Sequence, residues 1–465
     1  MKSFTSTLAC LVALLALHPG ANGGVLQERQ GLWLGELKTP DGRTLRLGAE
    51  LLTRADGSLW ASFASPDQDA YDIPVKGVAE TEQGVELDLS FATMKMTWDK
   101  DHFIGEFTQN GVPQPLVLKQ VQQLPVRARP QTPAAPFPYR DETLAIAGAD
   151  GVVLGATLSL PAGVARPNVV VLVHGSGPGN RDAQIAGHRG FAVIADYLAR
   201  RGIAVLRYDK RGVARSTGDY AGHVQTQLAD DLGAVVRALK KREQFKRVGL
   251  VGVSEGPAIA AAVSARDPEA VDFVVSLAGT GLTGLDMILL QDRVYAQGNK
   301  AGPKDLARLM LYARKWYGII VAEADAGARV AKLKAMRAAL SPHDKALVEK
   351  FKMNVGTLTL EWAGQPSLRA SLLADPRKDW RAVHVPVLAL NGGLDRQVPA
   401  RENLGGIVGA LKAGGNEQVE SAILPSLNHL FQTANTGAED EYARIEETIS
   451  PLVLQKIAAF IKKQP

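Results

Sequence analysis

Residues 252–256 carry the pattern Gly-Val-Ser-Glu-Gly, which is typical of a nucleophile elbow. An apolar run ending at Gly252 predicts a strand before it, and the Ala- and Ile-rich stretch from Pro257 to Ala265 predicts a helix after it. So tight a turn accepts only small residues beside the serine, and it leaves backbone N–H groups free at the helix start. The pattern also arises by chance, so its surroundings decide whether Ser254 is a nucleophile.

A serine nucleophile needs a histidine as its base and a carboxylate that orients the histidine. His429 is the only histidine after His384, and it follows the last predicted strand of the chain. Asp395 follows the preceding predicted strand, directly after a Gly-Gly-Leu turn. The order Ser254, Asp395, His429, with each residue at the carboxyl end of a strand, is the order of α/β-hydrolases. We predict that these three residues form a catalytic triad.

The oxyanion of such a reaction needs two N–H donors. We expect one from the backbone of Glu255, and the other from the glycine-rich loop at residues 175–182. Within that loop Ser176 is the first choice as donor and Gly177 the second. His174, just before the loop, is either a second base or a brace that hydrogen-bonds the backbone, and we favour the brace.

The side chain of Glu255 would oppose the oxyanion if it pointed inward. We therefore expect it to turn away and pair with Arg181 or Arg211, the alternative being an exposed glutamate without a partner. Asp209 and Arg211 either touch substrate or form a charge pair that ties their loop down, and we favour the charge pair.

Strands and helices alternate after residue 139, which predicts a mostly parallel sheet with helices on both faces. The predicted hairpin covers 144–160, the strands 168–174, 203–208, 247–252, 271–278, 385–391 and 419–424, and the main helices 190–200, 223–241 and 442–463. The fold class is therefore α/β, an α/β-hydrolase fold over residues 139–465.

Between about residues 280 and 380 this alternation gives way to mostly helical sequence. An insertion at the carboxyl end of a sheet strand lies over the ligand crevice, so we expect a helical lid. Its tryptophans, Trp316 and Trp362, would then lie near a bound acyl chain, the alternative being that they are core aromatics.

Residues 25–122 have a different texture, with turn pairs between short alternating runs. They predict a small all-β domain, either a sandwich or a partly open barrel. Trp33, Trp60 and Trp98 either bind sugars or lipid or fill the core of this domain, and we favour the core. A proline-rich linker at residues 123–138 separates this domain from the rest.

The chain has 465 residues, of which 46% are hydrophobic and 22% charged, as in an ordinary globular protein. Residues 1–23 have the lysine, apolar run and small-residue site of a signal peptide, so we expect an exported, periplasmic or secreted protein. Cleavage removes Cys10, the single cysteine, and Lys2, which changes the formal charge to +5 − 1 = +4. We expect no nucleic-acid partner, no membrane insertion, and no metal or other cofactor.

Five segments resemble one family of bacterial α/β-hydrolases, those akin to serine aminopeptidases, and in particular its carboxylesterase branch with an N-terminal β domain. They are His-Gly-Ser-Gly-Pro at 174–178, Arg-Tyr-Asp-Lys-Arg-Gly at 207–212, Gly-Val-Ser-Glu-Gly at 252–256, Asn-Gly-Gly-Leu-Asp-Arg-Gln-Val-Pro at 391–399 and Leu-Asn-His-Leu-Phe-Gln at 427–432. The resemblance implies hydrolysis of short or medium acyl esters through a serine acyl-enzyme. Val253 and Pro257 depart from the usual residues of the family.

Three functions remain open from the sequence. The first is an exported carboxylesterase whose partner is a small-molecule ester. The second is a peptidase or thioesterase of the same fold, and a peptidase would need a lid carboxylate such as Glu323 or Asp325 to hold the substrate amine. The third is a non-catalytic binding protein that uses the β domain, against which the intact triad argues.

Overall fold

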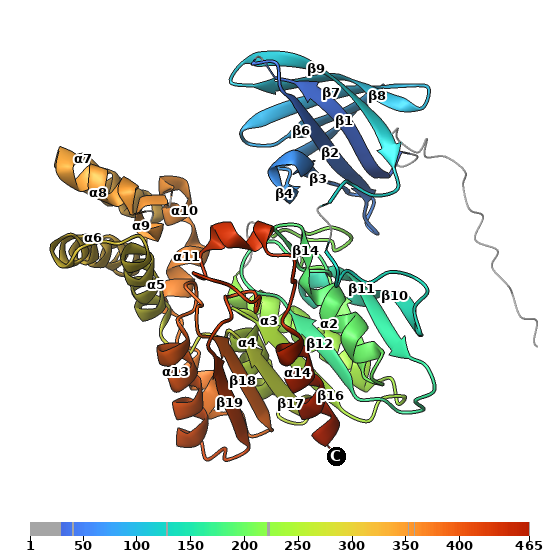
Figure 1. The fold of residues 1–465 in the computed structure, drawn as a ribbon, viewed down its shortest axis with the longest axis vertical. Helices are drawn as coiled ribbons and strands as arrows, with labels where there is room; N and C mark the ends of the chain where they lie inside the picture. Colours follow the sequence, from blue (N-terminus) through green and yellow to red (C-terminus); the bar gives the residue numbers. More distant parts are fainter. Residues whose placement is uncertain are drawn as a thin grey trace, which may run out of the picture.

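The structure is a computed structural model that describes residues 29–39, 41–126, 129–220, 224–351, 353–357 and 359–464. Figure 1 shows two bodies of strands, an N-terminal one made almost entirely of strands and a second one layered with helices. The expected signal peptide at 1–23 lies outside the described residues. Within the described ranges, no helix combines the length and the apolar character that a membrane span requires.

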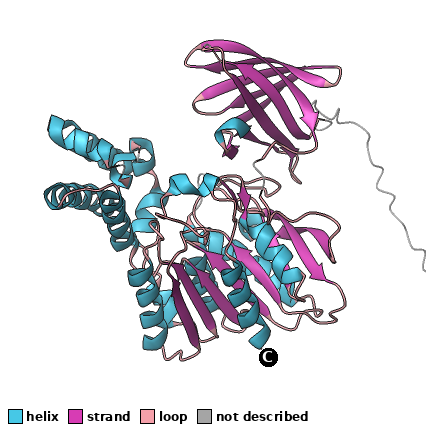
Figure 2. Cartoon of the chain, in the orientation of Figure 1, coloured by secondary structure: helices cyan, strands magenta, loops and turns pink. Residues whose placement is uncertain are grey.

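The N-terminal body is one antiparallel sheet of nine strands in the order β4-β3-β2-β1-β9-β8-β7-β6-β5, curled on itself (Figure 2). Its inward side chains alternate with outward ones and form a core of their own. The strands are β1 Gly31–Lys38, β2 Thr44–Thr53, β3 Leu59–Ser65, β4 Ala70–Pro74, β5 Gly77–Thr81, β6 Gly84–Asp88, β7 Ala92–Asp99, β8 His102–Gln109 and β9 Val112–Val121, with the 3-10 turn η1 at Pro66–Gln68.

The tryptophans of this sheet do not share one environment. Trp33 is 1% exposed and packs edge-on against Trp98 and Phe103, with ring centroids 5.7 and 4.7 Å apart, so the core interpretation is confirmed for Trp33 and Trp98. Trp60 corrects that interpretation, because it packs outside this core against a small cluster that includes Val213 of the second body.

The second body is built on an eight-stranded mixed sheet in the order β10-β11-β15-β12-β16-β17-β18-β19. The hairpin β10–β11 and the pair β11–β15 are antiparallel, and every pair from β15 to β19 is parallel, as the sequence predicts. The strands are β10 Tyr139–Ala147, β11 Val153–Pro161, β12 Val169–Val173, β15 Ala204–Tyr208, β16 Val248–Val253, β17 Phe273–Leu277, β18 Val387–Gly392 and β19 Val419–Leu424; η2 Ala149–Gly151 joins the hairpin, and β13 Gln184–Ile185 pairs with β14 His188–Arg189.

Helices cover both faces of this sheet and bury its continuous apolar strands in two cores (Figure 2). One face carries α2 Gly190–Ala199 and α14 Pro451–Lys463. The other carries α3 Gln225–Lys240, α4 Gly256–Arg266, α12 Arg377–Arg381 and α13 Ala400–Ala413. This arrangement confirms an α/β-hydrolase architecture.

The closing helix is shorter than the 442–463 expected from the sequence. The chain instead forms the 3-10 turn η3, Glu439–Arg444, and begins α14 at Pro451. Proline lacks the N–H of a helix interior and disfavours a helical residue before it, so it starts this helix rather than continuing an earlier one.

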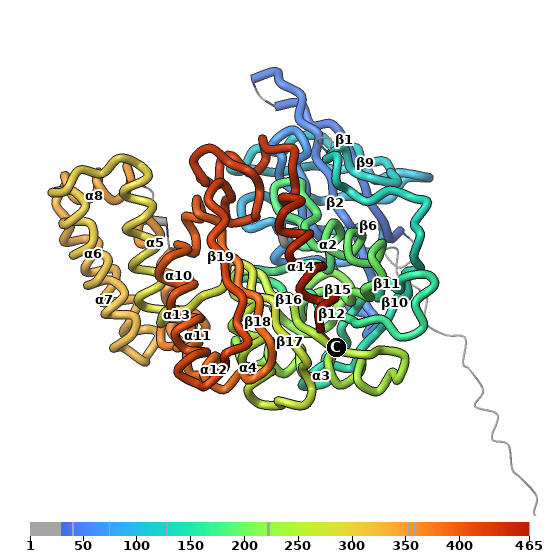
Figure 3. Tube along the Cα trace, turned by 60° about the horizontal axis from the view of Figure 1, so that its bottom comes forward, coloured from blue at the N-terminus to red at the C-terminus, as the bar shows by residue number. Residues whose placement is uncertain are grey.

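The segment between β17 and α12 is helical and has a core of its own. Figure 3 shows α6, α7 and α8 standing away from the sheet. The backbone N–H of Gly284 donates to the carbonyl oxygen of Ala374 at 2.9 Å, so the two ends of the segment meet. The helices are α5 Gly284–Gly298, α6 Pro303–Ala322, α7 Ala326–Ala338, α8 Pro342–Lys350, α9 Asn354–Thr357, α10 Leu360–Gly364 and α11 Pro366–Leu373.

Candidate active site

Ser254 sits in the sharp turn between β16 and α4 with φ +60°, a left-handed backbone that few non-glycine residues adopt. The glycines around it allow that turn. A Cβ on Gly252 would lie 2.4 Å from the nitrogen of Pro257, and one on Gly256 would lie 2.3 Å from the carbonyl oxygen of Val173. The two glycines are therefore fixed by backbone contact, and the elbow predicted from the sequence forms.

The structure brings Asp395 and His429 together at the neighbouring strand ends. Oδ2 of Asp395 lies 2.8 Å from Nδ1 of His429, and the carboxylate side chain is fully buried. Oδ1 accepts the backbone N–H groups of Gln397 and Val398, at 2.9 and 2.8 Å. These bonds hold the carboxylate in place, and they assign the Nδ1 proton of His429 to it, which leaves Nε2 for a substrate-side proton.

His429 is balanced between two opposing influences. Burial favours its neutral form, but the negative charge of Asp395 and the hydrogen bond that His429 donates to it outweigh burial, so the pKa of His429 is raised above 6.5. Among the described residues, Ser254 Oγ makes no hydrogen bond to this imidazole. Such contacts commonly shorten only when substrate binds.

The oxyanion loop, residues 175–182, approaches the nucleophile at its first residue. A Cβ on Gly175 would lie 2.9 Å from Cβ of Ser254, so only glycine allows this contact. Gly177 has φ +88°, and its backbone lies close enough to the hydroxyl of Tyr220 to lower the pKa of that group, against the larger effect of burial. Ser176 stays the first choice, and Gly177 the second, for the donor that acts beside the N–H of Glu255.

Lys210 is a residue of the site that the sequence reasoning passed over. Its side chain is 3% exposed, and Nζ donates to the carbonyl oxygens of Gly175 and Gly177 at 2.6 and 3.0 Å. Burial lowers the pKa of Lys210 to about 8, and the charge of Glu255 opposes this shift. Its only signal in the sequence is its position inside the charged run 207–212, beside Asp209 and Arg211.

The prediction that Glu255 pairs with Arg181 or Arg211 was wrong. Its carboxylate lies 3.9 Å from Nζ of Lys210, and its Oε1 lies 3.5 Å from Nε2 of Gln225. Arg181 and Arg211 are both occupied elsewhere, each by a buried aspartate. The side chain does turn toward a cation, but the cation is the lysine that also holds the oxyanion loop.

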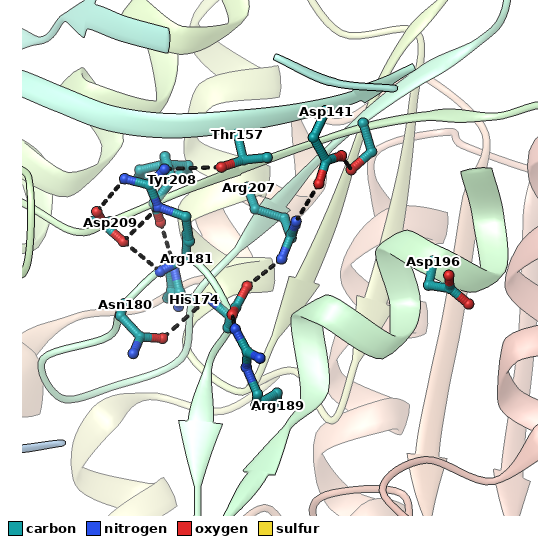
Figure 4. A network of polar contacts seen from close by, with 12 residues as sticks. Asp141, Thr157, His174, Asn180, Arg181, Arg189, Asp196, Arg207, Tyr208 and Asp209 are labelled. Atoms are coloured by element: carbon teal, nitrogen blue, oxygen red, sulfur yellow. Dashed lines mark hydrogen bonds and ion pairs between the residues drawn. The ribbon is translucent and has the colours of Figure 1, made fainter. Parts of the chain in front are cut away.

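Figure 4 shows the charge pair that fixes the far end of the oxyanion loop. Arg181 donates to Asp209 through Nε at 3.1 Å and Nη2 at 2.6 Å, and to Oγ1 of Thr157 through Nη1 at 2.9 Å. Arg211 makes a similar double contact with Asp231, at 2.7 and 2.9 Å. The favoured role of Asp209 and Arg211, tying down their loop, is confirmed, although each pairs with a residue outside the loop.

His174 is a structural brace, as expected. Its Nε2 lies 2.8 Å from the carbonyl oxygen of Tyr208, a contact drawn in Figure 4. Burial, followed by the charge of Lys210, lowers the pKa of His174 to about 3, so the ring is neutral and donates Nε2–H to that carbonyl.

The expected acyl-chain tryptophans do not form a common binding surface. Trp316 is 0% exposed in the core of the helical segment, and Arg337 covers its ring at 4.7 Å, so its assignment to substrate binding is corrected. A residue at the centre of a helix bundle has no surface left for a ligand. Trp362 is 45% exposed on α10, and its assignment to substrate binding stays a prediction.

No group of three or more His, Cys, Asp or Glu residues suited to a metal occurs in the described ranges.

The parallel strand ends carry a strained serine on one side and a carboxylate-oriented histidine on the other, and the chain thus has the design of a serine α/β-hydrolase. Residues 167–432 match the family model described as "Serine aminopeptidase, S33". This match spans more than half of the chain, and the protein belongs to that family.

Among known proteins, esterase EstD of Thermotoga maritima is 31% identical over 143 residues, which is 31% of this chain and 33% of that protein. The match therefore spans only about a third of that relative's length. Two solved structures are similar: Est1E from Butyrivibrio proteoclasticus, at 15% identity over 69% of this chain and 98% of that one with a TM-score of 0.40, and an esterase from Pyrococcus furiosus, at 17% identity over 70% and 92% with a TM-score of 0.41.

Proposed function

We propose that the protein is a serine esterase that cleaves carboxylic esters of short to medium acyl chains through an acyl-enzyme. The observation that carries the proposal is the buried pair of Asp395 and His429, 2.8 Å apart, at the same sheet edge as the left-handed Ser254. The similarity to an esterase over about a third of the chain supports ester substrates over other acyl compounds.

The reaction follows from these positions. Nε2 of His429 takes the proton of the Ser254 hydroxyl while Oγ attacks the ester carbonyl. The N–H groups of Glu255 and Ser176 receive the oxyanion, and the charge of Asp395 offsets that of the imidazolium. Protonated His429 gives its proton to the departing alkoxide, which leaves as the alcohol. Water then repeats the sequence on the acyl-enzyme and releases the acid.

We also propose that the helical segment acts as a lid over this site. Its first helix, α5, lies against the segments that carry the acid and the base. Nε2 of Gln291 donates to the carbonyl oxygen of Gln397 at 2.9 Å, and the hydroxyl of Tyr295 donates to Glu439 at 2.6 Å. A movement of α5 would therefore be felt within two residues of Asp395.

The peptidase alternative is less well supported by the same segment. Glu323 is held by Nζ of Lys332 at 2.6 Å, and Asp325 caps α7 by accepting the N–H of Ala328 at 2.7 Å. Neither carboxylate is free to hold a substrate amine in this arrangement. A thioesterase would use the same triad and is separated from an esterase by assay alone.

The test is labelling with a fluorophosphonate probe, followed by p-nitrophenyl esters of increasing chain length and by aminoacyl anilides. We expect labelling, and ester hydrolysis that exceeds anilide hydrolysis. Ser254→Ala should abolish both, while Ser264→Ala is the matched control, because its buried hydroxyl on α4 has no hydrogen-bond partner among the described residues. Labelling of Ser254→Ala would contradict the assignment, and preference for anilides would favour the peptidase.

Export is a separate proposal that rests on the sequence of residues 1–23 alone. N-terminal sequencing of the protein from the periplasmic and culture fractions tests it. A mature chain beginning near residue 24 is expected, and an uncleaved chain retained in the cytosol would contradict it.

A further inference from the structure

The N-terminal sheet contacts the second body through its β2, β3 and β4 end, where β4 also lies next to β13. This docking surface consists of Leu52, Arg54, Trp60 and Asp72, on or next to β2, β3 and β4, the end of the sheet that Figure 1 shows toward the second body. Leu52 is buried in a cluster with Val213 and Ala214, against which Trp60 packs. The apolar part of the surface therefore rests on the loop that follows β15.

The polar part of the docking surface grips two loops. Nη2 of Arg54 donates to the carbonyl oxygen of Gly212 at 2.6 Å, and Nε donates to that of Ala214 at 3.1 Å. Both acceptors belong to the 210 loop, residues 209–220. Oδ2 of Asp72 accepts from Nδ2 of Asn180 at 3.0 Å, and Asn180 belongs to the oxyanion loop.

These two loops lead directly to the reacting groups. Gly212, which Arg54 holds, is packed so closely on Tyr220 that a Cβ there would lie 2.3 Å from the backbone nitrogen of Tyr220. The hydroxyl of Tyr220 lies beside the backbone of Gly177 in the oxyanion loop. A shift of the 210 loop would therefore pass through Tyr220 to a loop that touches Ser254 at its first residue.

Lys210 joins the two loops at a second point. It lies in the 210 loop, and its ammonium donates to the carbonyl oxygens of Gly175 and Gly177. Its backbone N–H donates to the carbonyl oxygen of Gly179 at 3.0 Å. The two loops thus form one hydrogen-bonded unit, and the docking surface holds that unit from outside.

We propose that the N-terminal sheet is a positioning element of the active site, and that Arg54 and Asp72 hold the oxyanion loop in register with Ser254. The inference rests on the proposed function, since it assigns the sheet a part in the same acyl transfer. Arg54 and Asp72 touch neither the substrate carbonyl nor the triad, and act through the two loops. A misplaced oxyanion donor slows the chemical step and leaves substrate binding nearly unchanged.

The experiment compares Arg54→Met, Asp72→Ala and their combination with wild type in the full-length protein. Each lost set of contacts should lower kcat and the rate of fluorophosphonate labelling about threefold to tenfold, as expected for one or two hydrogen bonds. KM should stay within about twofold of wild type, because these residues do not contact substrate.

Three further variants separate positioning from folding. Asp72→Asn keeps an oxygen acceptor for Asn180 and should restore most of the rate lost in Asp72→Ala. Arg54→Lys keeps a cationic donor and should restore part of it. Arg43→Met removes an exposed arginine beside β2 of the same sheet, where it pairs with Asp41, and should leave the labelling rate unchanged.

Labelling rates of Arg54→Met and Asp72→Ala equal to wild type, in folded protein, would overturn the inference. If no ester is hydrolysed but the labelling rate still depends on Arg54 and Asp72, the proposed substrate class is wrong and the inference stands. If wild type is not labelled at all, the proposed function fails and the inference falls with it.

Discussion

The ammonium of Lys210 lies 3.9 Å from the carboxylate of Glu255, the residue directly after the nucleophile. The same ammonium holds two carbonyls of the oxyanion loop. One buried cation therefore connects the two segments that are expected to supply the oxyanion donors. An ion pair in such surroundings matters through what it orients more than through its net stability.

The first prediction concerns this pair. Lys210→Met should lower kcat by about 10- to 100-fold with little change in KM, because it removes the cation beside Glu255 and the ammonium that holds the carbonyls of Gly175 and Gly177, at a cost of about 1.5–3 kcal/mol. Glu255→Gln should lower kcat less. In the double variant the losses should be non-additive by at least about 0.5 kcal/mol, measured as a double-mutant cycle on kcat.

Arg181→Ala and Arg211→Ala, each combined with Glu255→Gln, are the controls for this cycle. Both arginines pair with other carboxylates, so their effects should add to that of Glu255→Gln. Additivity of Lys210→Met with Glu255→Gln would show that the 3.9 Å contact has no functional weight. Coupling of Glu255→Gln with either arginine substitution would contradict the assignment of Lys210 as its partner.

The second prediction is the acid limb of the pH–rate profile. His429 must be neutral to act as a base, and its pKa is raised above 6.5 by Asp395 against the effect of burial. Activity should therefore rise with pH and reach half of its maximum above pH 6.5 in kcat/KM. Asp395→Asn should move this limb to lower pH and reduce kcat by about 10⁴-fold. A midpoint well below 6.5 in wild type would contradict the pairing.

The third prediction concerns the pH dependence of sheet docking. Burial raises the pKa of Glu50 to about 7 and that of Asp72 to about 6, from 4.5 and 3.8. The folded protein thus binds these protons more tightly than the unfolded chain, and the stability they contribute at low pH is lost as the pH rises through about 6 to 7. The charged groups that act on Glu50 come from both bodies and are Asp72, Arg215, Asp209 and Arg181. Those that act on Asp72 are Arg189, Asp182 and Asp209, and Asn180 donates a hydrogen bond to it.

Glu50→Gln removes one of these titrations and should therefore stabilise the protein at pH 8 more than at pH 5. The measurement is the difference in unfolding midpoint between the variant and wild type at both pH values. Glu86→Gln, a substitution in an exposed ion pair with Lys95 on the same sheet, is the control and should show no such trend. An equal effect of Glu50→Gln at both pH values would refute the prediction.

The fourth prediction separates the two tryptophans of the helical segment. Trp316→Ala should cost about 3–5 kcal/mol in the free energy of unfolding, because it empties the centre of a packed core. Trp362→Ala, at an exposed site, should change it by about 0.5 kcal/mol or less. Chemical unfolding and an ester chain-length series on both variants test this. A chain-length preference altered by Trp316→Ala without loss of stability would restore its assignment to substrate binding.

The architecture of the second body can be predicted from the sequence because its signals come from residues that are close together in the chain. Buried parallel strands are continuous apolar runs, and the glycines of the elbow are demanded by backbone contacts with their immediate neighbours. Ser254, Asp395 and His429 could be selected because each follows a strand, and parallel strands end at one edge.

The sequence does not predict which charged side chains pair with one another at the carboxyl edge of the sheet. Lys210, Arg211 and Arg181 lie on adjacent loops, and only the direction of each side chain decides that Lys210 faces Glu255. The burial of Trp316 could have been predicted from the sequence, because apolar residues recur at helical spacing on one face of α6. These residues are Leu309, Ala313, Trp316 and Ile320, and all are buried. No sequence pattern predicts how the N-terminal sheet docks, because the neighbours of Trp60 in the sequence do not distinguish it from a tryptophan in the core of the sheet.

The bond between Gly284 and Ala374 makes the helical segment a closed excursion from the hydrolase body. Chain that leaves and returns at the same point can be lengthened, shortened or exchanged without pulling on the strands that carry the triad. Its separate core means that a change confined to α6, α7 and α8 need not reach the contacts that α5 makes with the segments of the acid and the base. Evolution can therefore replace this segment while keeping the hydrolase body, and protein design can exchange it in the same way.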